Sequence, residues 1–138
     1  MSVQIFPDDG EVRLLQVIKD GGGVFTLRLL KDNMSPTQDT EIGDFTGKEA
    51  TFSGYAAGTI TWATPTIAAH KGSMSGSAIT FTHNGGATAN TIYGYYITEA
   101  GGRSAEVISV EIFDASKLMS ASGDLITITP KITANSEN

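Results

Sequence analysis

Two glycine-bounded stretches come close to catalytic motifs, and each departs from its motif at the residue that would do the chemistry. Residues 72–76, Gly-Ser-Met-Ser-Gly, space their glycines as in the nucleophile elbow of hydrolases, but Met74 stands at the centre and presents a thioether. Residues 43–48, Gly-Asp-Phe-Thr-Gly-Lys, have three residues between the glycines where a phosphate-binding loop has four. Glu49 follows where that loop needs a hydroxyl residue for magnesium, and its carboxylate would repel a phosphate. Neither stretch predicts a catalytic site.

The other residues that could do chemistry do not form a recognisable site in the sequence. His70 and His83 are not in metal-ligand spacing and are interpreted as loop or strand-end residues. Glu106 and Glu111 are the acids at expected strand positions, but a glycosidase pair is defined by its separation in space, and both could be solvated. The chain has no cysteine, which excludes disulfides, thiolate catalysis and Cys-ligated zinc. We therefore predict that the protein is not an enzyme and has no catalytic residues, metal site or cofactor.

Composition limits the class of protein and its partners. A chain of 138 residues is long enough for one domain with a proper core, and we expect a single domain over 1–138. Its formal net charge of −6 argues against binding to nucleic acid or to an anionic membrane surface. The sequence lacks both the long apolar run of a membrane span and the features of a signal peptide at residues 1–9. We expect a soluble protein made in a cytoplasm.

The elements that must position any site centre on residues 91–98, Thr-Ile-Tyr-Gly-Tyr-Tyr-Ile-Thr, which hold three of the four tyrosines. Apolar or aromatic residues occupy both parities, whereas a strand with one solvated side alternates apolar with polar residues. The two sides of a strand here would carry Ile92, Gly94 and Tyr96, and Tyr93, Tyr95 and Ile97. The stretch predicts a strand covered on both sides, either inside the protein or by a partner, with Gly94 at a bulge or a close approach.

A short helix is expected near residues 9–20. Asp8 is placed to cap it with Glu11 three residues on, and glycines follow Lys19 and Asp20 as a stop signal. Glu11, Leu14, Leu15 and Ile18 would share one side of this helix. A strand is the alternative, because Val12, Leu14 and Ile18 also share a parity.

The rest of the chain predicts short strands separated by turns rich in Gly, Asn and Ser. The other expected strands are residues 24–31, 52–57, 58–63, 78–83, 105–113 and 125–132, and Pro130 marks the last as an edge strand or a strand end. Residues 70–76 and 117–123 are expected to be loops. About eight short strands and no alternation of strands with helices predict a mainly β protein, an antiparallel β-sandwich or jelly roll with one short N-terminal helix.

Residues 32–48 form a long polar connection between two expected strands. It contains Pro36 and four acids, Asp32, Asp39, Glu41 and Asp44. Loops of this length without structure of their own are uncommon in a compact domain. We therefore expect this connection to be functional or to be ordered by a neighbouring molecule.

Taken in order along the chain, these stretches resemble a family. The series comprises Pro-Asp-Asp-Gly-Glu-Val-Arg-Leu-Leu at 7–15, residues 27–33 with Pro36, Asp44-Phe45, Phe-Ser-Gly-Tyr-Ala at 52–56, Trp62, Phe81-Thr82, the tyrosine strand, 111–113 and 126–130. It is similar to small structural proteins of tailed bacteriophages, in particular capsid cement (decoration) proteins of β-sandwich or jelly-roll type. The resemblance implies a virion protein on the head surface, made in the host cytoplasm. It also implies a homotrimer that binds the major capsid protein.

Two hypotheses of function follow. The first is a cement protein whose candidate interface residues are Tyr93, Tyr95, Trp62, Tyr55, Asp44 and Phe45. The second is a tail-associated or host-surface binding module in which Tyr55, Trp62 and Tyr93 form a platform for stacking sugars. Burial discriminates between them, because a glycan platform needs an exposed row of aromatic rings, whereas core packing or a subunit contact covers them.

Overall fold

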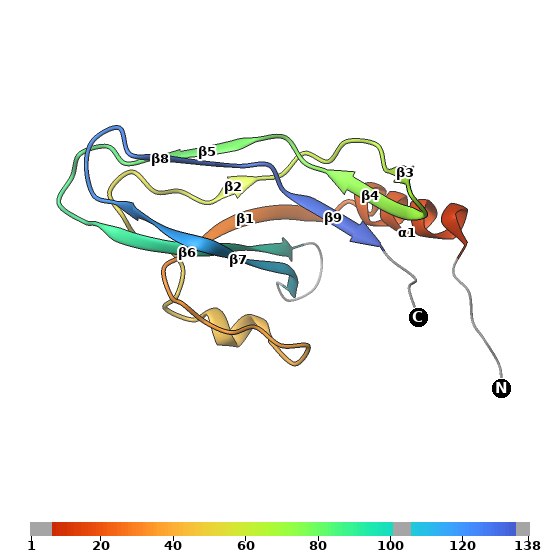
Figure 1. Ribbon diagram of the computed structural model, residues 1–138, viewed down its shortest axis with the longest axis horizontal. Helices are drawn as coiled ribbons and strands as arrows, with labels where there is room; N and C mark the ends of the chain where they lie inside the picture. Colours follow the sequence, from red (N-terminus) through yellow and green to blue (C-terminus); the bar gives the residue numbers. More distant parts are fainter. Residues whose placement is uncertain (1–6, 101–105, 135–138) are drawn as a thin grey trace.

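Nine antiparallel strands and one α-helix make up the regular structure of residues 7–100 and 106–134, the part of the chain that the computed structural model describes (Figure 1). The strands form three hydrogen-bonded sheets in the orders β2-β1-β6-β7, β3-β4-β9 and β5-β8. The elements are α1 (Asp8–Asp20), β1 (Val24–Leu30), β2 (Gly58–Thr59), β3 (Thr66–Ala68), β4 (Lys71–Ser75), β5 (Ile79–Thr82), β6 (Asn90–Ala100), β7 (Glu106–Met119), β8 (Leu125–Ile128) and β9 (Lys131–Ala134). The predicted mainly β, antiparallel, sandwich-like fold with a helix near the N-terminus is confirmed.

The two smaller sheets form one long ribbon that lies over the four-stranded sheet (Figure 1). β4 pairs with β9 and β5 with β8, and the register changes by one residue between Ser75↔Lys131 and Ile79↔Ile128. At this bulge the N–H of Gly76 donates to the carbonyl of Pro130 at 2.8 Å. The single strand predicted over residues 125–132 is therefore wrong in its bounds: β8 ends at Ile128 and β9 begins at Lys131, with Pro130 between them at a strand end.

Residues 58–63 join the two layers along one side. Thr59 pairs with Thr26 of β1, and three residues further on Trp62 bridges to Gly76 of the ribbon. On the other side the layers are not joined: among the described residues, β7 pairs with β6 alone and β8 with β5 alone. The sandwich is therefore closed along one side and open along the other.

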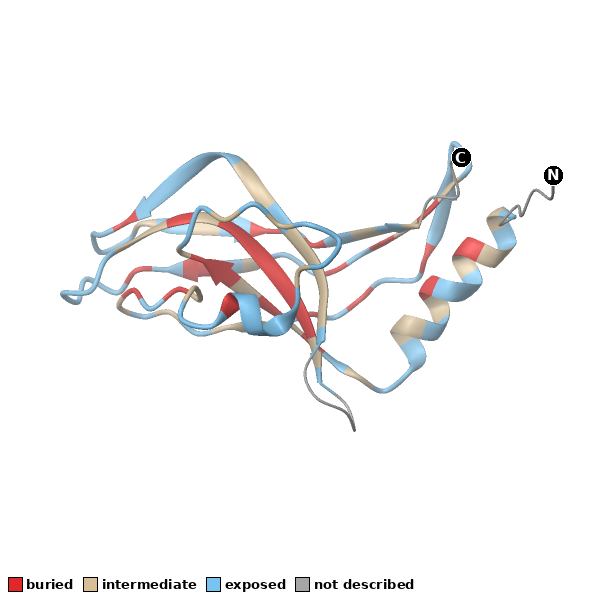
Figure 2. Cartoon of the chain, turned by 90° about the horizontal axis from the view of Figure 1, so that it is seen from below, coloured by how far each residue is buried: buried red, intermediate tan, exposed pale blue. Residues whose placement is uncertain are grey.

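The core lies between the layers. Leu27, Leu29 and Ile97 of the four-stranded sheet are fully buried, and Phe81 and Ile128 contribute from the ribbon. Figure 2 shows the buried positions running along the strands and the exposed ones covering most of the turns.

β6 confirms the prediction of a strand covered on both sides, and it lies between β1 and β7. Tyr95 packs in the main core, whereas Tyr96 belongs to a second buried cluster on the other side of the sheet. The predicted assignment of Ile92 to the same side as Tyr96 is wrong, because Ile92 lies in the main core. The register with β7 shifts between Ile92 and Gly94, and this irregularity breaks the alternation of the strand.

Helix α1 is where the sequence predicts it, but its N-terminus differs. The N-cap is Pro7 and makes no side-chain cap hydrogen bond, so the capping role predicted for Asp8 is wrong. Glu11 is buried, and its carboxylate accepts a hydrogen bond from the N–H of Gly72 at 2.7 Å. A Cβ on Gly72 would lie 2.9 Å from the Cβ of Glu11, so this glycine lets α1 pack closely on β4. Leu14 is half exposed and lies off the buried side of the helix.

Several predicted strand boundaries are wrong. Residues 52–57 are irregular, whereas β4 occupies most of the predicted loop 70–76 and β7 extends to Met119 across part of the loop predicted at 117–123. β3 and β4 are joined by a two-residue turn in which Ala69 and His70 have φ of 49° and 58°. His is among the residue types enriched at positive φ, but Ala is not, and the pair lacks the Asn-Gly or Asp-Gly sequence that signals a two-residue hairpin turn.

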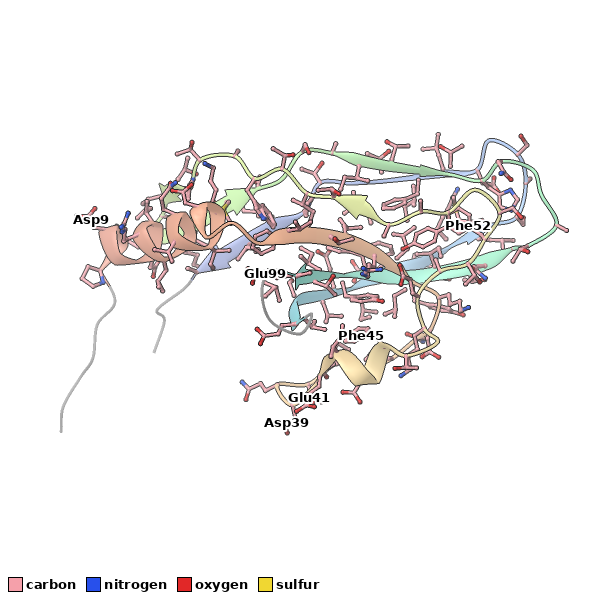
Figure 3. The ribbon with its side chains drawn as sticks, turned by 180° about the vertical axis from the view of Figure 1, so that it is seen from behind. Asp9, Asp39, Glu41, Phe45, Phe52 and Glu99 are labelled. Atoms are coloured by element: carbon pink, nitrogen blue, oxygen red, sulfur yellow. The ribbon has the colours of Figure 1, made fainter. Side chains whose placement is uncertain are left out.

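The connection between β1 and residue 49 has structure of its own. It contains a 3₁₀ helix, Ile42–Phe45, and its base is closed by a hydrogen bond from the N–H of Lys31 to the carbonyl of Lys48. Figure 3 shows Phe45 directed at the sheet and the acids Asp39 and Glu41 on the far side of the connection. The 3₁₀ helix and this hydrogen bond give the connection structure of its own within a single chain.

Candidate functional site

A groove of about 410 Å³ lies on the open side of the sandwich, between β7 and β8. It is lined by Tyr95, Glu111, Phe113, Ala115, Lys117 and residues 126–129. The β7 residues are every second one, as expected for one side of a strand, whereas the β8 residues are consecutive, as expected along a strand edge. The groove therefore exposes side chains of β7 on one wall and the main chain of β8 on the other.

The groove has an apolar floor. The ring of Tyr95 packs against that of Phe113 with centroids 6.1 Å apart, and Ile126 and Ile128 face them from the ribbon. Tyr95 and Ile128 are buried, and Phe113 and Ile126 are partly buried. Ligand sites in proteins have this character, with an apolar lining and a few placed polar groups.

One carboxylate is held at the edge of the groove. The hydroxyl of Tyr95 donates to an Oε atom of Glu111 at 2.6 Å. Burial raises the pKa of Tyr95, and the hydrogen bond and negative charge of Glu111 raise it further, so the phenol stays a neutral donor. The hydroxyl of Tyr95 thereby orients the carboxylate of Glu111.

A second polar cluster lies on the other side of the four-stranded sheet and ties the 31–49 connection down. The Nη1 atom of Arg28 donates to both carboxylate oxygens of Glu49, at 3.0 and 3.1 Å, in a charge-assisted contact. The hydroxyl of Tyr55 donates to Glu49 at 2.9 Å and accepts from the N–H of Leu29 at 3.1 Å. Burial raises the pKa of Tyr55 well above its usual range. This arrangement fixes side chains and can hold the connection in place.

Tyr96 anchors the same connection through its ring. It stacks on Phe45 with centroids 4.3 Å apart, and both side chains are buried. Burial, followed by the charge of Glu49, raises the pKa of Tyr96 from its ordinary 10.0 to about 12. The phenol therefore ionises more readily in the unfolded chain than in the folded one.

Alkaline pH should destabilise the fold through this group. Between about pH 10 and 12 the folded state holds the Tyr96 proton and the unfolded state has lost it, so the free energy of unfolding falls as pH rises. The Tyr96→Phe variant keeps the stack on Phe45 but has no phenol to ionise. Its free energy of unfolding should therefore fall by about 2 kcal/mol less than that of the wild type over this window. Urea unfolding at both ends of the window measures the difference. Equal losses in the two proteins would contradict the assignment.

A second hollow of about 370 Å³ lies between the connection and the start of β7. It is lined by Pro36, Thr37, Gln38, Thr40 and residues 107–110. Its lining is half polar and half apolar residues and holds no charged side chain. It therefore offers less to a ligand than the β7–β8 groove.

The structure separates the residues predicted for an interface. Tyr95 lines the groove, Tyr93 is half-buried on β6, and Asp44 is exposed in the 3₁₀ helix, where its carboxylate accepts a hydrogen bond from the N–H of Glu41. Phe45 is buried on Tyr96.

The aromatic residues considered for a sugar platform do not form an exposed row. Trp62 is 7% exposed and packs edge-on against Phe25 at 5.8 Å. Its indole N–H is buried without a hydrogen-bond partner among the described residues. Tyr55 is half-buried and stacks on Phe81. These rings pack in the core.

Sequence reasoning missed most of the groove. It identified Tyr95 and considered Glu111 only as half of an acid pair with Glu106, which lies exposed at the start of β7 and outside the groove. The alternation within the strand predicted over residues 105–113 does place Glu111 and Phe113 on one side, as the groove has them. The approach of residues 126–129 depends on the packing of the layers and leaves no local signal.

The histidines have structural surroundings. His83 is buried, with its ring nitrogens hydrogen-bonded to the carbonyl of Thr88 at 2.9 Å and the N–H of Gly85 at 3.0 Å. His70 is exposed, 3.2 Å from Asp8. No cluster of three His, Cys, Asp or Glu side chains that could hold a metal ion occurs within residues 7–100 and 106–134. In the same residues, α1 falls short of the length and apolar character that crossing a membrane requires.

Comparison of the chain with protein-family models, with curated proteins and with solved structures finds no match. The function proposed below therefore rests on the geometry of the chain and on the resemblance of its sequence described above.

Proposed function

We propose that this chain is a structural binding protein, namely a cement protein on the head of a tailed bacteriophage. The resemblance of its sequence to such proteins supports this proposal. In this proposal it binds the major capsid protein from the outside of the shell, assembles with copies of itself as a trimer and stabilises the head. The observation that carries the proposal is the open side of the sandwich, where two end strands flank an apolar groove. Exposed strand edges beside an apolar groove bind other polypeptides through main-chain and apolar contacts.

The anchored 31–49 connection supports the same role. Arg28, Glu49 and Phe45 hold it against the sheet, and its acids Asp39 and Glu41 lie on the far side. A surface loop fixed in this way loses little further entropy when it docks, which favours binding.

Rupture of heads tests the proposal. A protein that binds only the assembled shell stabilises it by about 2.7 kcal/mol per site at a hundredfold excess over its dissociation constant. Heads that carry the protein should therefore survive a higher temperature or a larger osmotic shock than heads without it. Docking through apolar and main-chain contacts predicts only a modest effect of added salt, unlike a phosphate-binding protein.

The control is a set of heads to which an unrelated acidic protein of similar size is added. Identical rupture with and without the protein, at low and at high salt, would contradict the cement role and would favour the tail-associated or receptor-binding alternative.

A further inference from the structure

We infer that the β7–β8 groove binds an extended segment of a partner protein, with apolar side chains and a basic residue, as a strand added to the edge of β8. The inference rests on the proposed function in one respect, that the chain works by binding another polypeptide. It adds which surface binds and what chemistry the bound segment has.

The main chain of β8 supplies the first argument. Within the described residues β8 pairs with β5 only, so the N–H and C=O groups along its other edge are not used by a neighbouring strand. Those groups are the template that an extended peptide completes. The consecutive residues 126–129 that line the groove belong to this edge and its immediate continuation.

β7 faces the groove differently. Its register with β6 shifts between the pairs Ile92↔Lys117 and Gly94↔Ile112, which leaves residues 113–116 opposite Tyr93 alone. A bulge of this size bends the strand and disrupts regular pairing on its far edge. The added strand is therefore expected to pair with β8 and to rest its side chains on β7.

The side chains define what the segment carries. The floor of Tyr95, Phe113, Ile126 and Ile128 is apolar, and an extended peptide directs every second side chain toward one side. A segment that alternates apolar and polar residues buries its apolar side on this floor.

Charge defines the rest. The hydroxyl of Tyr95 orients the carboxylate of Glu111 by donating to its Oε2 atom at 2.6 Å. This hydrogen bond does not involve the Oε1 atom. A lysine or arginine of the bound segment is its complement. Lys117 also lines the groove, six residues further along β7, so the basic residue of the segment is placed at the Glu111 end. The net charge of −6 favours a basic partner over a second copy of this acidic chain in the groove.

Synthetic peptides and the full-length protein test the inference. The probe is a fluorescent peptide of alternating valine and threonine with a central lysine, and its twin carries N-methyl groups on alternate amides, which prevents strand pairing but keeps the side chains. Fluorescence anisotropy should show that the twin binds at least about tenfold more weakly, since several main-chain hydrogen bonds are lost. Amide hydrogen exchange should slow in β8 when the first peptide is bound.

Paired variants test the charge. Glu111→Gln should weaken binding of the lysine peptide about two- to fivefold, as for an exposed ion pair, and should leave a peptide with central glutamine unchanged. Glu106→Gln, on the same strand and outside the groove, should change neither. Equal binding of the N-methylated twin, equal effects of the two glutamine variants, or no binding of the lysine peptide would overturn the inference. The Ala115→Trp variant fills the groove. If it stabilised heads as well as the wild type does, the groove inference would be overturned and the cement role would stand. Peptide binding without any effect on heads would support the groove inference and contradict the cement role.

Discussion

Gly94→Ala is expected to destabilise the protein by at least about 2 kcal/mol, because the two longest strands touch at this residue. A Cβ on Gly94 would lie 2.1 Å from the carbonyl oxygen of Glu111 and 3.0 Å from the Cα of Ile112. Both atoms belong to the main chain of β7, which cannot swing aside as a flexible side chain can. The strands must separate locally, and the hydrogen bonds on either side of the bulge must lengthen or break.

Gly43→Ala is the matched control. A Cβ on Gly43 would meet no atom within 4 Å, and the residue lies in the exposed 3₁₀ helix. Its free energy of unfolding in urea should change by less than about 0.5 kcal/mol. A loss of similar size from both variants would mean that the close approach of β6 and β7 does not limit stability.

Phe81→Ala is expected to cost about 3–5 kcal/mol, the usual range for truncating a buried phenylalanine. Phe81 is 4% exposed, belongs to the main core and stacks on Tyr55 with centroids 5.8 Å apart. Its removal leaves a cavity beneath the ribbon that the paired strands cannot easily close. Small domains are stable by only about 5–15 kcal/mol, so the midpoint of urea unfolding should fall clearly.

Leu125→Ala provides the comparison within the same strand pair. Leu125 is 53% exposed and pairs with Thr82, the neighbour of Phe81. Its truncation should cost less than about 1 kcal/mol. If the two variants lost equal stability, Phe81 would not be a core residue and the packing of the ribbon on the sheet would be wrong.

The sequence allowed the central strand and the class of fold to be predicted for physical reasons. β6 carries apolar side chains at both parities, which only a strand covered on both sides tolerates, and Gly94 marked the close approach that the structure contains. The glycines after α1 and the apolar spacing within it placed the helix to within one residue.

The failures also have physical causes. β4 reads Lys-Gly-Ser-Met-Ser, and glycine and serine are poor strand formers, so nothing local favours a strand. The strand forms because β3 and β9 flank it and because Gly72 gives α1 room to pack on it. The groove was missed for a similar reason, since Glu111 and Ile128 meet through the stacking of two layers.

The ribbon has a consequence for the order of events during synthesis. β4 and β5 are made some fifty residues before their partners β9 and β8, whereas β1, β6 and β7 can pair as soon as β7 is complete. Until residues 125–134 leave the ribosome, the inner side of β4 and β5, with Met74 and Phe81, lacks the strands that hold it over the core. Pairing between strands this distant in sequence is slow. A nascent chain halted before residue 125 should therefore be prone to aggregate. Pairing of β8 and β9, the last strands to be made, is the step that commits the chain to its native state.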